Sequence, residues 1–210
     1  MTLAAGFLEA HRGAYEDLNV FGVAGRVTGP TDPPAHKLYR LNVLRRGVGS
    51  FNYHTAETAF SARGCNMSFR REELLRIGGF DTRFSGSACR EDTDVSIRIG
   101  SRRGRIIFCP SASLTHHEVP SGGCHVADVV GETRDISWEV NNFLFYLKNL
   151  PRHRLLPIAF VHVLSAIKHG NGPRGVLKRA SRSWLAFRRA QEISTTDPFA
   201  RSKRADLLTR

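Results

Sequence analysis

The sequence has few cysteines, and no two of them have the spacing of a metal-binding finger. The four are Cys65, Cys89, Cys109 and Cys124. Disulfide frameworks and zinc fingers both use closely and regularly spaced cysteines. The pattern therefore argues against both and predicts reduced thiols in a cytosolic setting, with Cys65 and Cys109 in the core.

The sequence also lacks an apolar run long enough to cross a bilayer. Its most apolar stretch, Leu155 to Ile167, contains Pro157 and His162, whereas a spanning helix needs about 20 apolar residues. No basic segment followed by a long apolar run opens the chain, so an export signal is not expected. These absences predict a cytoplasmic protein, with a peripheral location on the inner face of the plasma membrane as the one membrane association left open.

Acidic residues are scarce only near the end of the chain. Residues 148–210 carry 14 Lys or Arg against 3 Asp or Glu, a net charge of +11, whereas residues 1–147 carry 17 against 16. The overall net charge of +12 therefore belongs to the C-terminal part. Such a part suits a polyanionic partner, either nucleic acid or a membrane surface. The near-neutral body and the lack of a nucleic-acid-binding motif favour the membrane.

Alternating strand-like and helix-like segments predict an α/β fold. The predicted strands are 20–27, 62–69, 105–109 and 112–115, and the predicted helices are 2–12, 71–77, 91–102 and 132–147. Gly78-Gly79 and Gly104 end two of the helices, as glycine after a helix commonly does. Residues 29–58 and 118–130 are rich in Gly, Pro or Ser and are predicted to be irregular.

Three carboxylates, on Glu91, Asp92 and Asp94, fall in the first turn of the predicted helix 91–102. Acids in this position commonly serve the helix alone, because they face the positive end of its dipole. The glycine turn Gly78-Gly79-Phe80-Asp81 shortly before them instead favours a functional site. A carboxylate there suits a general base that accepts a hydroxyl proton. Arg98 is predicted to pair with Asp94, four residues earlier.

His116 and His117 follow the predicted strand 112–115. A histidine at such a place is more often a polar strand end than a ligand. Near several carboxylates, it is also suited to a mixed His/Asp site for Mg²⁺ or Mn²⁺. Both interpretations stay open on the residues alone.

Together these segments resemble family 2 glycosyltransferases, inverting enzymes with the GT-A nucleotide-diphospho-sugar fold, and in particular bacterial polysaccharide and rhamnosyl-type members. The resemblance covers roughly residues 1–150. Its motifs are Gly64-x-Asn66-Met67-Ser68-Phe69-Arg70-Arg71, Gly78-Gly79-Phe80-Asp81, Glu91-Asp92-Thr93-Asp94-x-Ser96-x-Arg98, Pro110-x-Ala112-x-x-x-His116, and Asn142 with Tyr146, Lys148 and Asn149.

The resemblance implies a role for each motif residue. Asp92 would be the general base that deprotonates an acceptor hydroxyl, and Glu91 and Asp81 would orient the acceptor or the base. His116 would help to hold a divalent metal, Mg²⁺ or Mn²⁺, on the donor diphosphate. The residues implied to bind the acceptor are Asp81, Gly79, Phe80, Asn66 and Arg98, of which Arg98 would also brace the acidic helix. The donor would be a nucleotide-diphospho-sugar and the acceptor a glycan or a lipid-linked saccharide.

Members of this family open with a nucleotide-binding half that ends in an Asp-x-Asp metal motif. Thr2 to His11 resembles the helix directly after that motif, and Asp92-Thr93-Asp94 has the spacing but lies in the acidic helix. The resemblance therefore implies only the C-terminal, acceptor-side part of a GT-A fold in residues 1–150, with little or no activity by itself. The alternatives are a non-catalytic partner subunit that binds glycan or membrane and, less favoured, a basic nucleic-acid-binding protein.

Residues 151–190 are predicted to form a basic, amphipathic helical appendage, followed by a disordered tail over 191–210. In the helix after Pro173, one face carries Val176, Ala180, Trp184 and Phe187, and the rest carries Lys178, Arg179, Arg182, Arg188 and Arg189. Aromatic and basic faces on one helix suit an anionic membrane surface, which Trp184, Phe187, Lys178, Arg179 and Arg182 would contact. Packing of the apolar stripe on the catalytic domain is the equal alternative.

Overall fold

The computed structural model describes residues 1–30, 32, 34–40, 48–86, 88–102, 104–118, 136–151, 153 and 155–196. They divide into two compact units. The first consists of the described residues of Met1–Asp81 and Glu91–Pro120, and the second of those of Thr82–Arg90 and Ser121–Arg210. This division differs from the predicted boundary at residue 150.

The strands of the first unit form a mixed five-stranded sheet in the order β1-β5-β2-β4, with β3 also paired to β5. They are β1 (Thr2–Leu3), β2 (Val20–Thr28), β3 (Glu57–Thr58), β4 (Met67–Phe69) and β5 (Arg105–Thr115). The central strands β2 and β5 run parallel, and the other pairings are antiparallel. Together with the helices, this sheet confirms the predicted α/β class.

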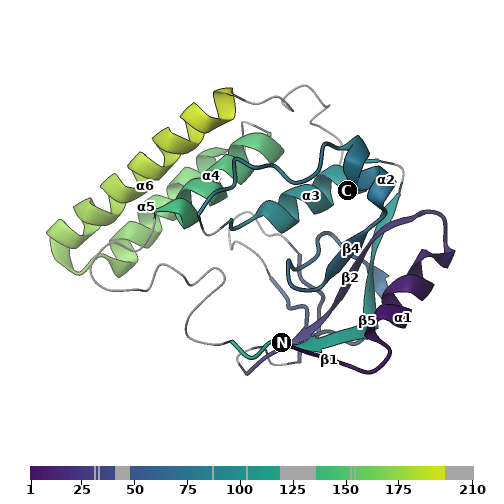
Figure 1. Ribbon diagram of the computed structural model, residues 1–210. Coiled ribbons are helices and arrows are strands. Elements are labelled where there is room, and N and C mark those ends of the chain that lie inside the picture. Colours follow the sequence, from purple (N-terminus) through teal and green to yellow (C-terminus); the bar gives the residue numbers. More distant parts are fainter. Residues whose placement is uncertain are drawn as a thin grey trace. The chain divides into compact units, whose positions relative to one another are not determined.

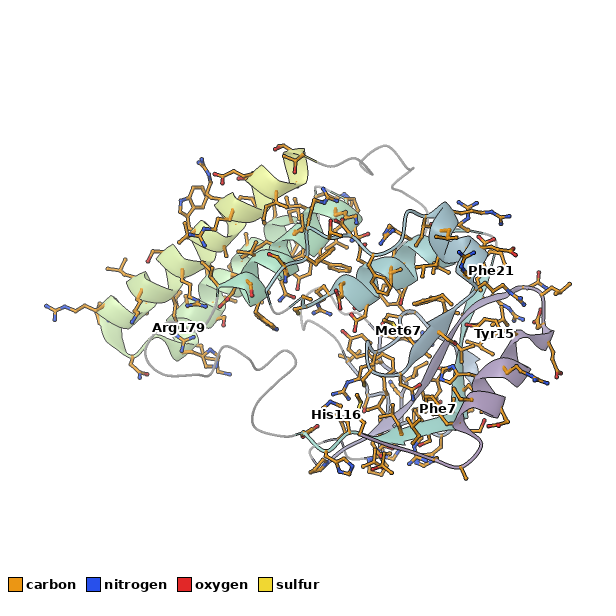
Figure 2. All side chains as sticks on the ribbon, viewed as in Figure 1. Phe7, Tyr15, Phe21, Met67, His116 and Arg179 are labelled. Atoms are coloured by element: carbon orange, nitrogen blue, oxygen red, sulfur yellow. The ribbon has the colours of Figure 1, made fainter. Side chains whose placement is uncertain are left out.

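Helices α1 (Phe7–Gly13), α2 (Arg71–Arg76) and α3 (Glu91–Gly100) complete the first unit, with a 3-10 turn at Ala14–Glu16. Helix α1 lies beside β5 (Figure 1). Val95 and Ile99, four residues apart and therefore on one face of α3, enter the core with Ile106 and Phe108 of β5. Phe7, Phe21 and Met67, labelled in Figure 2, pack against the same core.

Gly25 marks the tightest backbone approach in the centre of the sheet. A Cβ atom at Gly25 would lie 2.2 Å from Asn66 Oδ1 and 2.4 Å from the carbonyl oxygen of Ala112. Next to it the register of β2 against β5 shifts, because Gly25 is opposite Cys109 whereas the following residue, Arg26, is opposite Ser113. Glycine is therefore required where the irregular part of β5 and the Asn66 side chain converge on β2.

Helix α2 ends as its glycines predict. The amides of Gly78 and Gly79 donate to the carbonyl oxygens of Leu75 and Leu74, at 3.0 and 2.9 Å. Both glycines have a positive φ, +80° and +75°. This is the Schellman arrangement, in which two residues past the helix satisfy carbonyls of its last turn. The predicted end of this helix is confirmed.

Several predicted elements have other bounds in the structure. Residues 2 and 3 form β1 on β5, and the helix predicted from Thr2 begins only at Phe7. The strand predicted over 62–69 is reduced to β4, and the two predicted strands 105–109 and 112–115 form one strand, β5. Cys65 and Cys109 carry free thiols, as predicted, but are only half-buried. The predicted loop at 118–130 and the beginning of the helix predicted at 132 lie largely outside the described residues.

The second unit contains helices α4 (Ser137–Asn149), α5 (Leu155–His169) and α6 (Gly172–Thr195). Phe143 of α4 contacts the His162 ring of α5 and the Phe187 ring of α6, with centroid distances of 4.7 and 5.6 Å. A tight turn at Gly170 joins α5 to α6, since a Cβ atom there would lie 2.5 Å from the carbonyl oxygen of Ala166. Because α6 is helical to Thr195, the prediction of disorder from residue 191 was wrong for 191–195; residues 197–210 lie outside the described part.

The segment 82–90 belongs to the same unit as these helices. Asn141 donates to the carbonyl oxygen of Ser85 at 2.8 Å, and Arg90 Nε donates to Asn142 Oδ1 at 3.0 Å. Both asparagines are buried in the middle of α4. None of the helices in the described ranges is both long enough and apolar enough to cross a membrane.

Candidate functional site at the start of α3

The carboxylate of Asp92 is held in one orientation at the start of α3. Its Oδ2 accepts a hydrogen bond from the backbone amide of Gly64 at 3.0 Å. Its Oδ1 accepts from the amide and the hydroxyl of Thr93, at 2.6 and 3.1 Å. The side chain is half-buried. A carboxylate fixed by the backbone of a neighbouring turn can meet a reacting hydroxyl in one geometry, as a general base must.

The carboxyl of Glu91, the residue before Asp92, binds a proton more tightly than an ordinary glutamate does. Partial burial raises the pKa of the Glu91 carboxyl above its ordinary value, and the adjacent negative charge of Asp92 raises this pKa further. Two neighbouring carboxylates in one partly desolvated place are a common basis for proton transfer at neutral pH. The sequence showed that the two acids are adjacent, but not that Glu91 would be desolvated.

Asp94 and Arg98 form the ion pair that their spacing predicts, and this prediction is confirmed. Arg98 Nε donates to Asp94 Oδ2 at 2.8 Å, and Arg98 Nη1 donates to the carbonyl oxygen of Ile77 at 3.0 Å. The Asp94 side chain is completely buried. Arg98 thus braces α3 against the end of α2, whereas its predicted contact with an acceptor finds no support in this geometry.

The glycine turn after α2 serves mainly the fold. Phe80 packs against the core of the first unit, and Asp81 is 3% exposed. Gly79 has open space where a Cβ atom would be, and its conformation is that of a helix cap. The side chains of Phe80 and Asp81 are therefore not presented to an acceptor. At this turn, an acceptor would contact the backbone of Gly79.

Asn66 has a structural role instead of the predicted acceptor-binding one. Its Oδ1 accepts from His11 Nε2 at 2.9 Å, and its Nδ2 donates to the carbonyl oxygens of Arg26 and Ala112, at 2.8 and 2.9 Å. The residue is 1% exposed. An amide whose oxygen and nitrogen are already engaged inside the protein offers nothing to a ligand. Asn66 therefore joins α1, β2 and β5.

His116 follows β5, and its ring is already engaged on one side. The backbone amide of Glu118 donates to His116 Nδ1 at 3.2 Å. Within the described ranges, no three His, Cys, Asp or Glu side chains lie together as metal ligands would. These residues therefore do not by themselves fit the Mg²⁺ or Mn²⁺ site that the family resemblance implies.

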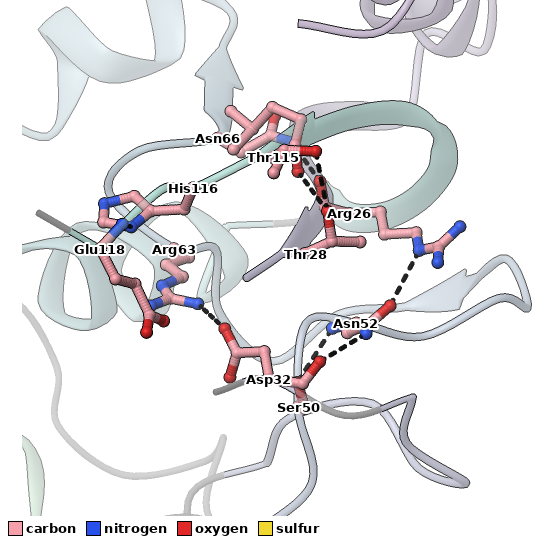
Figure 3. Close-up of polar contacts among 11 residues, drawn as sticks. Arg26, Thr28, Asp32, Ser50, Asn52, Arg63, Asn66, Thr115, His116 and Glu118 are labelled. Atoms are coloured by element: carbon pink, nitrogen blue, oxygen red, sulfur yellow. Dashed lines mark hydrogen bonds and ion pairs between the residues drawn. The ribbon is translucent and has the colours of Figure 1, made fainter. Parts of the chain in front are cut away.

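Arg63 and Asp32 form an ion pair in the first unit that the sequence did not indicate. Arg63 Nη1 and Asp32 Oδ2 are 2.7 Å apart (Figure 3). Both charges act on the nearby thiol of Cys65. Burial raises the pKa of this thiol, the charge of Arg63 lowers it, and the charges of Asp92 and Asp32 raise it further. The turn at 63–65 therefore brings Arg63 and Asp32 near Asp92. Asp32 belongs to the Pro-rich stretch 29–58, where no periodic pattern could have marked it.

Neither the protein-family models nor the curated proteins that were compared with the chain match it. Its function is therefore inferred from its own residues and their geometry.

The residues predicted to bind a membrane do not all face the same way. Trp184 is 60% exposed, and Lys178 is exposed as well. Arg179, labelled in Figure 2, is also exposed. Phe187, in contrast, packs on Phe143, and Arg182 donates to both carboxylate oxygens of Glu139, at 3.0 and 3.1 Å. Phe187 and Arg182 therefore stabilise the second unit, instead of making the membrane contact predicted for them.

Proposed function

We propose that the chain is the acceptor-side part of an inverting family 2 glycosyltransferase with a GT-A fold, and that the start of α3 is its catalytic site. The observation that carries the proposal is the Asp92 carboxylate, which the Gly64 amide holds next to Glu91, a carboxyl whose pKa is raised. The mixed α/β sheet and the five sequence motifs support the same assignment.

In this proposal Asp92 removes the proton from the acceptor hydroxyl. The freed electron pair of the hydroxyl oxygen forms a bond to the anomeric carbon of the donor sugar. The bond from that carbon to the diphosphate oxygen breaks on the opposite face, so the configuration inverts and a nucleoside diphosphate leaves. Oδ2 of Asp92 suits the transfer, because one bond from Gly64 orients it and leaves a second lone pair for the proton.

Glu91 and the Asp94–Arg98 pair have supporting roles in the proposal. Glu91 is close enough to Asp92 for their charges to interact, so it influences how readily protons move at the site. The Asp94–Arg98 pair holds the first turns of α3 in place. Donor recognition is not assigned to any residue of the described part, and no described residues form a metal site that would stabilise the leaving group.

The experiment is a transfer assay with the whole chain and a panel of nucleotide-diphospho-sugars, measuring release of nucleoside diphosphate in the presence of glycan and lipid-linked acceptors. Removing a general base slows the reaction by about 10²–10⁴-fold. We expect that loss for Asp92→Asn and a smaller one for Glu91→Gln. Glu72→Gln is the matched control, since Glu72 is an exposed acid in the first turn of α2. Equal rates for the wild type and Asp92→Asn would contradict the proposal, whereas a chain that holds only the acceptor-side part is expected to release little nucleoside diphosphate by itself.

A further inference from the structure

One face of α5 is apolar and uncovered in the described structure. Its residues are Leu156, Phe160, Val163, Leu164 and Ile167, whose exposed fractions range from 47% to 76%. Their spacing of three and four residues places them along a single face of the helix. Proteins that act alone in water seldom expose so continuous an apolar surface. We call these five residues the α5 face.

The orientation of this face is fixed by the opposite side of α5. Ile158 and Ala166 are buried there, and the His162 ring lies against Phe143 of α4. Because α5 is held on that side, it cannot rotate to bury the α5 face without losing these contacts.

Helix α6 adds a second exposed apolar stripe. Leu177 and Trp184 are seven residues apart and therefore lie on the same side of α6, and both are largely exposed. The Arg188 guanidinium lies over the Trp184 ring, 5.9 Å from its centroid. A tryptophan with an apolar neighbour and a cation over its ring is typical of the boundary between lipid tails and headgroups.

The charges around these apolar residues are almost all positive. From Leu155 to Thr195, where every residue is described, the only acidic residue is Glu192. Arg182 is paired with Glu139. The remaining cations are Lys168, Arg174, Lys178, Arg179, Arg188 and Arg189. Two copies of this surface would repel each other, whereas a negatively charged surface complements it.

We propose that the α5–α6 hairpin binds the surface of an anionic lipid bilayer. The α5 face, Leu177 and Trp184 enter the boundary of the acyl chains, and the cations contact headgroup phosphates. Helix α5 has 15 residues, about 22 Å of helix, which is less than the ~30 Å apolar core of a bilayer. The hairpin therefore lies in the plane of the interface. This inference is independent of the proposed transferase activity.

The test is flotation of the whole chain with vesicles of pure phosphatidylcholine and with vesicles containing one-third phosphatidylglycerol. We expect binding to the anionic vesicles, and a weakening of at least about tenfold for the double variant Phe160→Gln/Ile167→Gln, which removes inserted apolar surface. Lys178→Gln/Arg179→Gln should weaken binding by about tenfold or more through lost attraction. In a Trp138→Phe background, the fluorescence of Trp184 should shift to shorter wavelength on binding.

Leu75→Gln is the matched control, because Leu75 is exposed to nearly the same extent on α2, in the first unit. Circular dichroism establishes that each variant keeps its helices. Equal binding to the two vesicle types, or binding that the α5-face variant does not weaken, overturns the proposal. So does sedimentation of the wild type as a lipid-free oligomer that the Phe160→Gln/Ile167→Gln variant dissociates, since the α5 face would then be a protein interface.

Discussion

The carboxylate of Asp92 and the backbone amide of Gly64, 28 residues apart in the sequence, are joined by a hydrogen bond of 3.0 Å. This bond ties the first turn of α3 to the turn that precedes β4. The bond does not depend on which side chain stands at position 64, because the donor is backbone. A Cβ atom at Gly64 would lie 3.6 Å from Asp92 Oδ2, an ordinary contact distance.

Replacing Asp92 should therefore affect stability as well as the proposed activity. Asp92→Ala removes the acceptor of three hydrogen bonds at a helix start, and we expect a loss of about 1–2 kcal/mol in the free energy of unfolding. Urea denaturation followed by circular dichroism measures it. Gly64→Ala keeps the donor and is expected to change stability little. If the two variants were equally destabilised, the bond between these residues would not be the cause.

Glu91 should make stability depend on pH. The pKa of its carboxyl is raised in the folded protein, so the charged form is disfavoured by folding. Below the unfolded pKa, near 4.5, the carboxyl is protonated in both states and does not lower the free energy of unfolding. As the pH rises through the folded pKa, the folded protein must hold a disfavoured charge and loses stability. We expect Glu91→Gln to be more stable than the wild type at pH 7 and to lose that advantage at pH 4. Urea denaturation at both pH values measures the difference, and Glu72→Gln controls for the effect of an acid in a first helical turn.

The buried ion pair within α3 should be intolerant of single substitutions. Removing one partner of such a pair leaves the other charge buried, at a cost of about 3–5 kcal/mol. We expect Asp94→Asn and Arg98→Met each to approach that cost, and the double variant Asp94→Leu/Arg98→Met to cost less than the two combined. Thermal and urea unfolding test this. Arg40→Met provides the comparison, since Arg40 and Glu57 form a largely exposed pair, with an expected effect of about 0–1 kcal/mol.

Gly25 should not tolerate replacement by alanine, whereas Gly13, also in the first unit, should tolerate it. A methyl group at Gly25 would collide with Asn66 Oδ1 and with the backbone oxygen of Ala112. We expect Gly25→Ala to destabilise the first unit by about 2–4 kcal/mol. Gly13, with a φ of −59° and no atom near the position of a Cβ, should tolerate alanine, with a gain of up to about 1 kcal/mol. Equal effects of the two substitutions would show that the close approach at Gly25 is relaxed in solution.

The parts of the fold predicted correctly are those specified by neighbours in the sequence. The end of α2 depends on Gly78 and Gly79, and the Asp94–Arg98 pair depends on a spacing of four residues. Both are local signals that act in any context. The Asp32–Arg63 pair and the Asn66 network join residues far apart in the sequence, so no local pattern could reveal them. Of the proposed site, the acids of α3 could therefore be predicted from the sequence, but neither the partner of Asp92 nor the structural role of Asn66 could.

The side of α6 that packs could not be predicted from its large residues. The apolar stripe through Trp184 and Phe187 was equally suited to a membrane surface and to packing on the rest of the chain. The structure instead buries Ala186 and Ala190 completely, because small side chains allow a neighbouring helix to approach closely. A hydrophobic pattern weighted by size identifies the wrong side wherever close packing uses alanine.

The pairing of Thr2 with Thr115 sets the order in which the first unit can form during synthesis. Strand β1 leaves the ribosome before β5, its only partner strand in the described sheet, which follows about a hundred residues later. The parallel partner of β2 is the same late strand. Until β5 emerges, the segments that pair with it have exposed edges and their apolar residues are in water, and this exposure is characteristic of slow-folding, non-local sheets. The growing chain thus passes through a long interval in which the segments that pair with β5 have no partner strand there.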